Sequence, residues 1–251
     1  MKSSLFLTLI ISAFVLSGCL HTGLTPQPNA TTAPESEIQT PANQASPFTT
    51  PRKTPHYENS APAHAVILPA SPYNIVINFN FDLAASSQIT ITNNGKDYAP
   101  GATSIDINKL TLRRTMDATA PDGTYTVNYK ACWPDGSCHD GFFQFAIDRS
   151  QVSRYTDLRQ QQAITINLTN NNFSPQLIRI TKNTSVTWKN NDSVVHYVNT
   201  DPHPGHNFYP LQNSRVLNQG DSFIYTFTQP GIYLYHCSAH ADIMTGAILV
   251  E

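Results

Sequence analysis

Sulfur and nitrogen donors lie close together near the end of the sequence. Cys237, His240 and Met244 fall within eight residues, between a strand-like run and Gly246. A thiolate, an imidazole and a thioether need one more imidazole to complete a trigonal His2Cys site with a weak axial methionine, and His196 is the candidate for it. This donor set suits copper in both oxidation states, because sulfur holds Cu(I) and imidazole tolerates Cu(II).

Each of these side chains also has an ordinary structural explanation. A single histidine on a strand is commonly a surface or hydrogen-bonded residue, and a methionine or a buried cysteine commonly only packs. Their combination in this order favours a metal centre over separate structural roles. Zinc fits less well than copper, because the donor set is soft and asymmetric.

β-Strands must position these donors, since 163–251 shows alternating apolar and polar residues and no helical pattern of useful length. Along the strand that ends at Cys237, alternation places Tyr233, Tyr235 and Cys237 on one face and His236 on the other. His236 is therefore not expected to bind the same metal as Cys237. The predicted strands are 163–168, 177–180, 185–188, 194–198, 222–227, 231–237 and 246–250.

This region resembles the cupredoxins, the plastocyanin-like type 1 copper proteins. The resemblance rests on NFSP (172–175), VTW (186–188), NDSVVH (191–196) and PGIYLYHC (230–237), followed by His240, Met244 and Gly246 in the family's order. It spans 163–251 and implies a small Greek-key sandwich with one copper ion. The ligands that it implies are His196, Cys237, His240 and Met244. Four protein ligands leave no position for a substrate, so we expect a carrier and not an enzyme.

Two positions depart from the family's pattern. Three residues separate His240 from Met244, where familiar members have two or four, so we expect a ligand loop of different shape. Tyr197 follows His196 where an asparagine is frequent, and we expect the loss of a hydrogen bond near the thiolate. Such bonds help to set the potential of a bound metal.

The region 63–149 predicts another β-sandwich. Alternating runs at 73–79, 88–92, 124–129 and 142–147 indicate half-buried strands, and Asn-Gly and Asp-Gly pairs mark turns. The order of segments resembles the CopC copper-resistance family, with HAVILPASP (64–72) similar to its opening. DGTYTVNY (122–129), Asp135-Gly136 and GFFQF (141–145) are similar to its closing hairpin. The chain is thus predicted to be all-β, with two sandwiches joined by a polar linker at 150–162.

The copper site of the CopC family is only partly matched. That family uses a histidine at the mature N-terminus and a histidine directly after Asp-Gly. Here His64 has no free amine beside it, and Ser137 occupies the second position. His139 lies two residues further on, so His64 and His139 are candidate accessory ligands. The alternative is a spacer or docking module without metal.

Cys132 and Cys138 flank a Pro-Asp-Gly turn. In an oxidising compartment a disulfide between them is the default. The alternative is a second copper site built from Cys132, Cys138 and His139.

His203 and His206 belong to the loop DPHPGH (201–206). They are candidate ligands of an accessory copper or zinc site, or a contact for a partner. The alternative is a solvated loop.

The first 19 residues predict a lipoprotein signal peptide. Lys2 precedes an apolar run at 5–16 that is short for a membrane span, and small residues precede Cys19 as in a bacterial lipobox. Cys19 would then be the lipidated N-terminus; the alternative is an ordinary signal peptide. Leu20, in place of an aspartate retention signal, favours the outer membrane in a Gram-negative cell. Residues 20–62 are rich in Pro, Thr and Asn and predict a disordered tether.

Composition and motifs limit the classes of function. The formal net charge is -2 over 251 residues, so nothing indicates nucleic-acid binding. The sequence contains no nucleophile triad, phosphate loop or motif for a small-molecule substrate. The leading hypothesis is transfer of single electrons at the cell envelope, facing the periplasm, between redox proteins such as a cytochrome and an oxidase or reductase. The second is copper storage or trafficking, and the third is a metal-free structural role.

Overall fold

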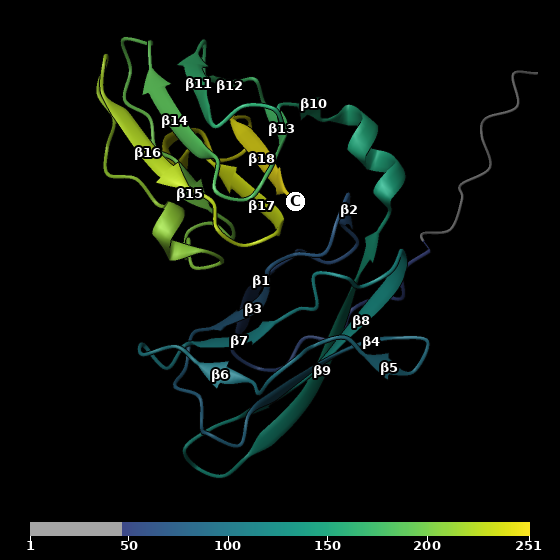
Figure 1. The fold of residues 1–251 in the computed structure, drawn as a ribbon. Helices are drawn as coiled ribbons and strands as arrows, with labels where there is room; N and C mark the ends of the chain where they lie inside the picture. Colours follow the sequence, from purple (N-terminus) through teal and green to yellow (C-terminus); the bar gives the residue numbers. More distant parts are fainter. Residues whose placement is uncertain (1–46) are drawn as a thin grey trace, which may run out of the picture. The chain divides into compact units, whose positions relative to one another are not determined.

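The computed structural model describes residues 47–251, which fold mainly into β-strands arranged as two sandwiches (Figure 1). The predicted all-β class with two sandwiches is confirmed. The signal peptide, Cys19 and most of the predicted tether lie outside the described residues. Helices in this range are the 3-10 segments η1 (Arg149–Arg154), η2 (Pro210–Gln212) and η3 (Ser238–His240). None of them is long and apolar enough to cross a bilayer.

The first sandwich consists of a sheet ordered β1-β3-β7-β6 and a sheet ordered β2-β9-β8-β4-β5. Alternate side chains of each strand point into this sandwich, because successive side chains of a strand point to opposite faces. In β4, Ile89 and Ile91 are buried while Gln88 and Thr90 are exposed. The strands are β1 Tyr57–Ala61, β2 Ile67–Leu68, β3 Asn74–Phe79, β4 Gln88–Asn93, β5 Lys96–Asp97, β6 Ser104–Ile105, β7 Thr111–Thr115, β8 Gly123–Cys132 and β9 Cys138–Ile147.

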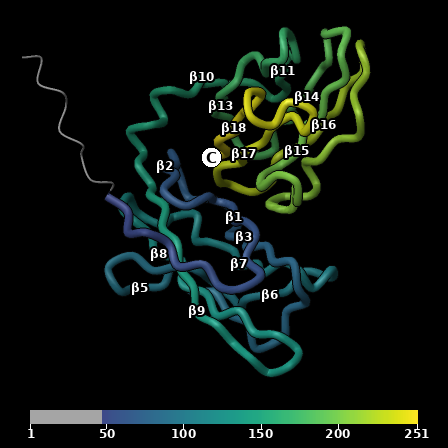
Figure 2. Tube along the Cα trace, turned by 180° about the vertical axis from the view of Figure 1, so that it is seen from behind, coloured from purple at the N-terminus to yellow at the C-terminus, as the bar shows by residue number. Residues whose placement is uncertain are grey.

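Strands β8 and β9 form a long antiparallel hairpin, which Figure 2 shows from behind. Its tight turn includes Gly136 at φ +85°, a conformation that glycine adopts without strain. Cys132 and Cys138 are paired residues at the end of the ladder, with Cα atoms 4.1 Å apart, and they form a disulfide. The predicted disulfide is confirmed, and its formation leaves neither thiol for a copper site.

The predicted boundary of the tether at residue 62 is too late. Tyr57–Ala61 forms β1 and pairs antiparallel with β3, and the backbone of Arg52 exchanges hydrogen bonds with that of Phe142. This segment contains few large apolar side chains, so its composition hides the pairing; Ser60 and Ala61 are nevertheless buried. The predicted linker 150–162 is also partly regular, because it contains most of η1 and all of β10.

The second sandwich has a sheet ordered β10-β13-β18-β17-β15 and a sheet ordered β12-β11-β14-β16. Its predicted start at 163 coincides with the start of β11, whereas β10 adds an edge strand from the linker. The strands are β10 Thr156–Asp157, β11 Ala163–Thr169, β12 Asn172–Ser174, β13 Leu177–Ile180, β14 Ser185–Asn190, β15 Asn199–Thr200, β16 Ser222–Thr226, β17 Gly231–His236 and β18 Thr245–Val250.

The core of the second sandwich lies on one face of β17. Tyr233, Tyr235 and Cys237 are all buried in the apolar cluster that contains Trp188. Leu234, on the opposite face of the strand, packs against the other apolar cluster. The alternation predicted for this strand is confirmed, and it fixes the direction in which the Cys237 thiol points.

The strand predicted at 194–198 is wrong. Residues 192–198 form a bend and loop in which His196 makes one isolated bridge to Leu217, and the strand of this region is β15, Asn199–Thr200. The apolar pair Val194 and Val195 suggested a strand, but both side chains are exposed. His196 is therefore held by a loop and not by a sheet.

The two sandwiches are part of one compact unit and share hydrogen bonds. The guanidinium of Arg113 donates to the carbonyl of Asn207 at 2.6 Å and to that of Phe208 at 3.1 Å. Asn74 Nδ2 also donates to the Phe208 carbonyl, at 3.2 Å. These contacts from the first sandwich fix the chain directly after the loop that contains His203 and His206.

Candidate metal centre

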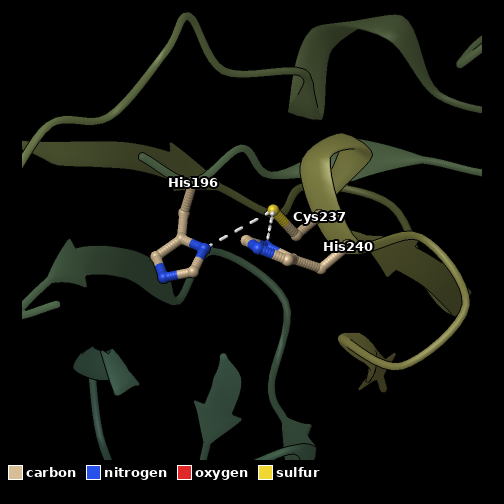
Figure 3. Close-up of side chains that lie close together, drawn as sticks. All are labelled: His196, Cys237 and His240. Atoms are coloured by element: carbon tan, nitrogen blue, oxygen red, sulfur yellow. Dashed lines mark hydrogen bonds between the residues drawn. The ribbon is translucent and has the colours of Figure 1, made fainter. Parts of the chain in front are cut away.

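His196, Cys237 and His240 converge in the second sandwich (Figure 3). Nδ1 of each histidine lies 3.6 Å from Cys237 Sγ, and the imidazole centroids are 5.2 Å apart. Cys237 and His196 are fully buried, whereas His240 is half-buried. The three predicted strong donors thus come together, with His240 alone partly open to solvent.

The spacing fits a first-row transition ion. An ion about 2.0 Å from nitrogen and about 2.3 Å from sulfur holds these two donor atoms about 3.5 to 3.8 Å apart. Both nitrogen–sulfur distances in the protein fall in this range. One buried thiolate with two imidazoles is also the donor set that copper prefers over harder ions. The residues present therefore fit copper.

Asp192 orients the imidazole of His196. Asp192 Oδ2 lies 2.9 Å from His196 Nε2, and the side chains are only 16% and 0% exposed. An ionised carboxylate only accepts hydrogen bonds, so Nε2 carries the proton and Nδ1 keeps its lone pair. That lone pair faces Cys237, as a metal ligand requires. Backbone hydrogen bonds between His196 and Leu217, 3.0 and 2.9 Å long, hold the loop itself.

The surroundings of Asp192 keep it ionised. Burial raises the pKa of this carboxyl, but hydrogen bonds from the backbone N–H groups of Asn171 and Asn170 and from His196 outweigh that effect. The net result is a pKa below the usual range. A half-buried negative charge is therefore in place beside a ligand histidine at neutral pH.

Cys237 lies at the junction between β17 and η3. Its backbone N–H donates to the Met244 carbonyl at 2.9 Å, and the His240 N–H donates to the Cys237 carbonyl at 2.8 Å. The Tyr197 backbone N–H donates to Cys237 Sγ at 3.3 Å. The thiolate therefore has one backbone donor, which does not depend on the side chain at position 197, and the expected loss of a side-chain hydrogen bond there stays a prediction.

Met244 is fully buried in the same apolar cluster as Cys237. Its N–H donates to the His240 carbonyl at 2.9 Å, so the three intervening residues form a compact turn that returns the chain to β18. The assignment of Met244 as an axial ligand stays a prediction.

His203 and His206 do not lie in a merely solvated loop, because they meet His236. Their ligand nitrogens and His236 Nε2 form a second group of converging donors, here called the three-histidine cluster. Burial, followed by the charges of neighbouring His236 and His203, lowers the pKa of His206 to about 4. This imidazole is therefore neutral at neutral pH.

The structure does not bring the two histidines of the first sandwich into a metal site. Across residues 47–251, neither His64 nor His139 joins a group of three or more converging His, Cys, Asp or Glu donors. His64 Nδ1 instead accepts from the backbone N–H of Gln144 at 3.2 Å. His139 is exposed beside the ring of Trp133.

Sequence reasoning missed two functional neighbours of the ligands. Asp192 lies inside the motif at 191–196, but a carboxylate four residues before a loop histidine carries no periodic signal. His236 was correctly assigned to the face opposite Cys237, yet its partners on that face come from a distant loop. The sequence signals for these partners were Asp201, at the start of that loop, and the two histidines within 201–206.

Comparisons with known proteins agree with this geometry. Residues 57–148 match the CopC domain model, and residues 160–251 match the model of copper binding proteins of the plastocyanin/azurin family. Halocyanin from Natronomonas pharaonis is 34% identical over 117 residues, which cover 43% of this chain and 70% of the halocyanin. Both resemblances seen in the sequence are confirmed.

Solved structures are similar to parts of the chain. A purple cupredoxin from Nitrosopumilus maritimus has 33% identity, with 35% of this chain and 99% of that chain covered and a TM-score of 0.32. CopC from Methylosinus trichosporium OB3b has 22% identity, with 38% and 94% covered and a TM-score of 0.35.

Proposed function

Because the chain belongs to the plastocyanin/azurin family of copper binding proteins, we propose that it carries single electrons at the cell envelope. The convergence of His196 Nδ1 and His240 Nδ1 on the buried Cys237 thiol is the observation that carries this proposal. Copper bound there supplies one-electron chemistry. With Met244 as a fourth ligand no position remains for a substrate, so the proposal is a carrier and not an enzyme.

The three converging ligands differ in their exposure to solvent. Cys237 and His196 are buried, which excludes water from the thiolate, while the half-buried His240 reaches the surface. Exposed apolar side chains neighbour the ligands in sequence, among them Val195 directly before His196 and Ile243 directly before Met244. Apolar side chains of this kind suit brief docking of a redox protein, such as a cytochrome or an oxidase or reductase.

Copper storage or trafficking is the second candidate function. The CopC domain at 57–148 favours it, since the resemblance of that domain is to a copper-resistance family. The two functions differ in the fate of the metal. An electron carrier retains copper through repeated oxidation and reduction, whereas a trafficking protein releases it to an acceptor.

The test begins with the full chain loaded with Cu(II). An intense visible charge-transfer band and a narrow copper hyperfine splitting are expected, and Cys237→Ser should abolish both. His139→Asn, which changes an exposed histidine outside the site, is the control and should leave them intact. Absence of any band that depends on Cys237 would contradict the proposal.

The loaded protein is then cycled between ferricyanide and ascorbate in the presence of a Cu(I) chelator. Retention of the band over repeated cycles supports an electron carrier. Rapid loss of copper to the chelator on reduction supports trafficking instead.

The proposed location depends on Cys19. A lipid on this residue would anchor the protein to the membrane with both sandwiches facing the periplasm, on the outer membrane in a Gram-negative cell. Cys19→Ser should abolish acyl labelling and release the protein from the membrane fraction. Unchanged labelling would show that Cys19 is not the lipidated residue.

A further inference from the structure

A second set of imidazoles converges on the other side of the strand that leads to Cys237. His203 and His206 lie in the loop after β15, and His236 is the last residue of β17. His203 Nδ1 is 3.2 Å from His206 Nε2 and 3.3 Å from His236 Nε2. Because successive side chains of a strand point to opposite faces, this three-histidine cluster is separate from the Cys237 centre.

We propose that His203, His206 and His236 form a second metal site, which binds a divalent late first-row ion, copper or zinc. Three nitrogens around an ion at about 2.0 to 2.1 Å in tetrahedral geometry lie about 3.3 to 3.4 Å apart. Two distances in the cluster closely match this edge length. Imidazole donors without a thiolate suit Cu(II) and Zn(II), and Cu(II) is expected to bind more tightly.

Asp201 prepares His236 for this role. Asp201 Oδ1 lies 2.8 Å from His236 Nδ1, and the His236 side chain is 4% exposed. The carboxylate accepts a hydrogen bond from Nδ1–H, so the lone pair of His236 is on Nε2, the atom that faces the other two imidazoles. A carboxylate behind a histidine in this way is a common support of metal ligands.

The loop holds His203 and His206 in place before any ion arrives. Pro202 and Pro204 flank His203; each proline has a fixed φ, and Pro204 also restricts the backbone of His203 before it. His206 has φ +47°, a left-handed conformation that non-glycine residues rarely adopt and that is enriched at functional sites. The His206 N–H donates to the Pro202 carbonyl at 2.8 Å, and Asn213 Nδ2 donates to the His206 carbonyl at 2.6 Å.

The surroundings leave room for exchange with solvent. His203 is exposed, His206 is intermediate and His236 is buried, so an ion would enter from the side of His203. Three protein ligands leave one coordination position for water. Ser238 Oγ lies 3.1 Å from His206 Nε2 and also accepts from Asn199 Nδ2 at 2.7 Å. This hydroxyl is a polar neighbour of the site and is not needed as a ligand.

A hydrogen-bonded histidine network without metal is the competing explanation. His203 Nδ1 is within hydrogen-bond distance of both other nitrogens, but a neutral imidazole nitrogen carries at most one proton. Without a metal, a single proton on His203 Nδ1 would then have to serve both close nitrogen–nitrogen contacts. A bound ion, in contrast, accepts a lone pair from each of the three nitrogens. The two explanations predict different numbers of bound metal ions per chain. Only the metal site predicts that binding of the second ion depends on His203.

The experiment uses the full chain with the Cys237 centre already filled with one equivalent of Cu(II). A second equivalent of Cu(II), or one of Zn(II) in a parallel sample, is added, and bound metal per chain is measured after desalting. Two ions per chain are expected. The second Cu(II) should have a wide hyperfine splitting and no intense visible band, which distinguishes it from the first.

His203→Asn should lower the affinity for the second ion by at least about 100-fold, since losing a direct ligand exceeds the 10- to 100-fold effect of losing a supporting residue. Asp201→Asn should lower it by roughly 10- to 100-fold. His139→Asn, an exposed histidine outside the cluster, should leave two ions bound. The Cys237-dependent band must persist in every variant, which confirms that each one folds.

The outcome for the three-histidine cluster can be distinguished from the outcome for the Cys237 centre. A second ion of either metal that is lost in His203→Asn and retained in His139→Asn supports the site. Only one ion per chain in protein that shows the Cys237-dependent band, or a second ion whose affinity is the same in His203→Asn, would overturn it. An unchanged protein that lacks the visible band but binds one ion that is lost in His203→Asn would contradict the proposed electron carrier and leave this inference standing.

Discussion

Replacing Asp192 by asparagine would remove a half-buried negative charge beside the centre while nearly preserving the shape of the side chain. Asp192 Oδ2 is 2.9 Å from His196 Nε2, on the side of the ring opposite the nitrogen that faces Cys237. A negative charge stabilises Cu(II) more than Cu(I). Asp192→Asn should therefore raise the reduction potential of bound copper.

The magnitude follows from the geometry. The 2.9 Å contact, the width of the imidazole and a metal–nitrogen bond of about 2.0 Å place the carboxylate about 7 Å from the metal. At an effective dielectric constant of about 20, unit charges at that distance interact by roughly 2.4 kcal/mol. For one electron this energy corresponds to a shift on the order of 100 mV. Copper affinity should also fall, by roughly 10- to 100-fold, because His196 loses the partner that fixes its protonated nitrogen.

The potential is measured by redox titration of the Cys237-dependent visible band in the full chain. Asp221→Asn is a matched control, because Asp221 accepts from the Asn218 backbone N–H at 3.0 Å and likewise fixes a turn, with no bond to a ligand histidine. The control should stay within about 20 mV of the unchanged protein, since the Asp221 side chain is 31% exposed and its charge is paired with Arg215 at 3.4 Å and screened by salt. An unchanged or lower potential in Asp192→Asn would refute the assignment.

Three further predictions concern the loop and the stability of each sandwich. Met244→Leu should keep the visible band and raise the copper potential, because a weak axial donor to Cu(II) is lost; an unchanged potential would remove Met244 from the ligand set. Replacing Cys132 and Cys138 by serine should lower the free energy of unfolding in urea by about 2 kcal/mol, because the disulfide closes a loop of sequence separation 6. Gly246→Ala would place a Cβ 2.4 Å from Cζ of the buried Tyr235 and should destabilise the protein by roughly 1 to 3 kcal/mol or more. Equal melting temperatures for Gly246→Ala and the unchanged protein would contradict that steric argument.

Local features of the chain were determined by the sequence. The alternation of Tyr233, Tyr235 and Cys237 follows from the period of a strand, and the structure buries all three on one face. The pairing of Cys132 with Cys138 follows from a short turn between them. Strand content and the division into two sandwiches follow from the same local patterns. The order of motifs was enough to place the chain among copper proteins.

Weakly patterned segments were predicted less well. Tyr57–Ala61 was assigned to a tether, because an edge strand can pair through its backbone without an apolar run. Residues 194–198 were assigned to a strand on the strength of two valines that proved exposed. In both cases the deciding interaction was a backbone partner far away in the sequence, at Phe79 and at Leu217.

Only the tertiary structure decided which groups meet at the two candidate metal sites. His196 and Cys237 are 41 residues apart, and His203 and His236 are 33 apart. The sequence nominated three of these residues but could not place Asp192 behind His196, or join His236 to His203 and His206. Residue types and the period of a strand are local properties, whereas a distance of about 3 Å between donors on separate loops depends on how the sheets and loops pack. That packing brings His196 and His240 to Cys237 on one side of the chain at the end of β17, and it brings His203 and His206 to His236 on the other side.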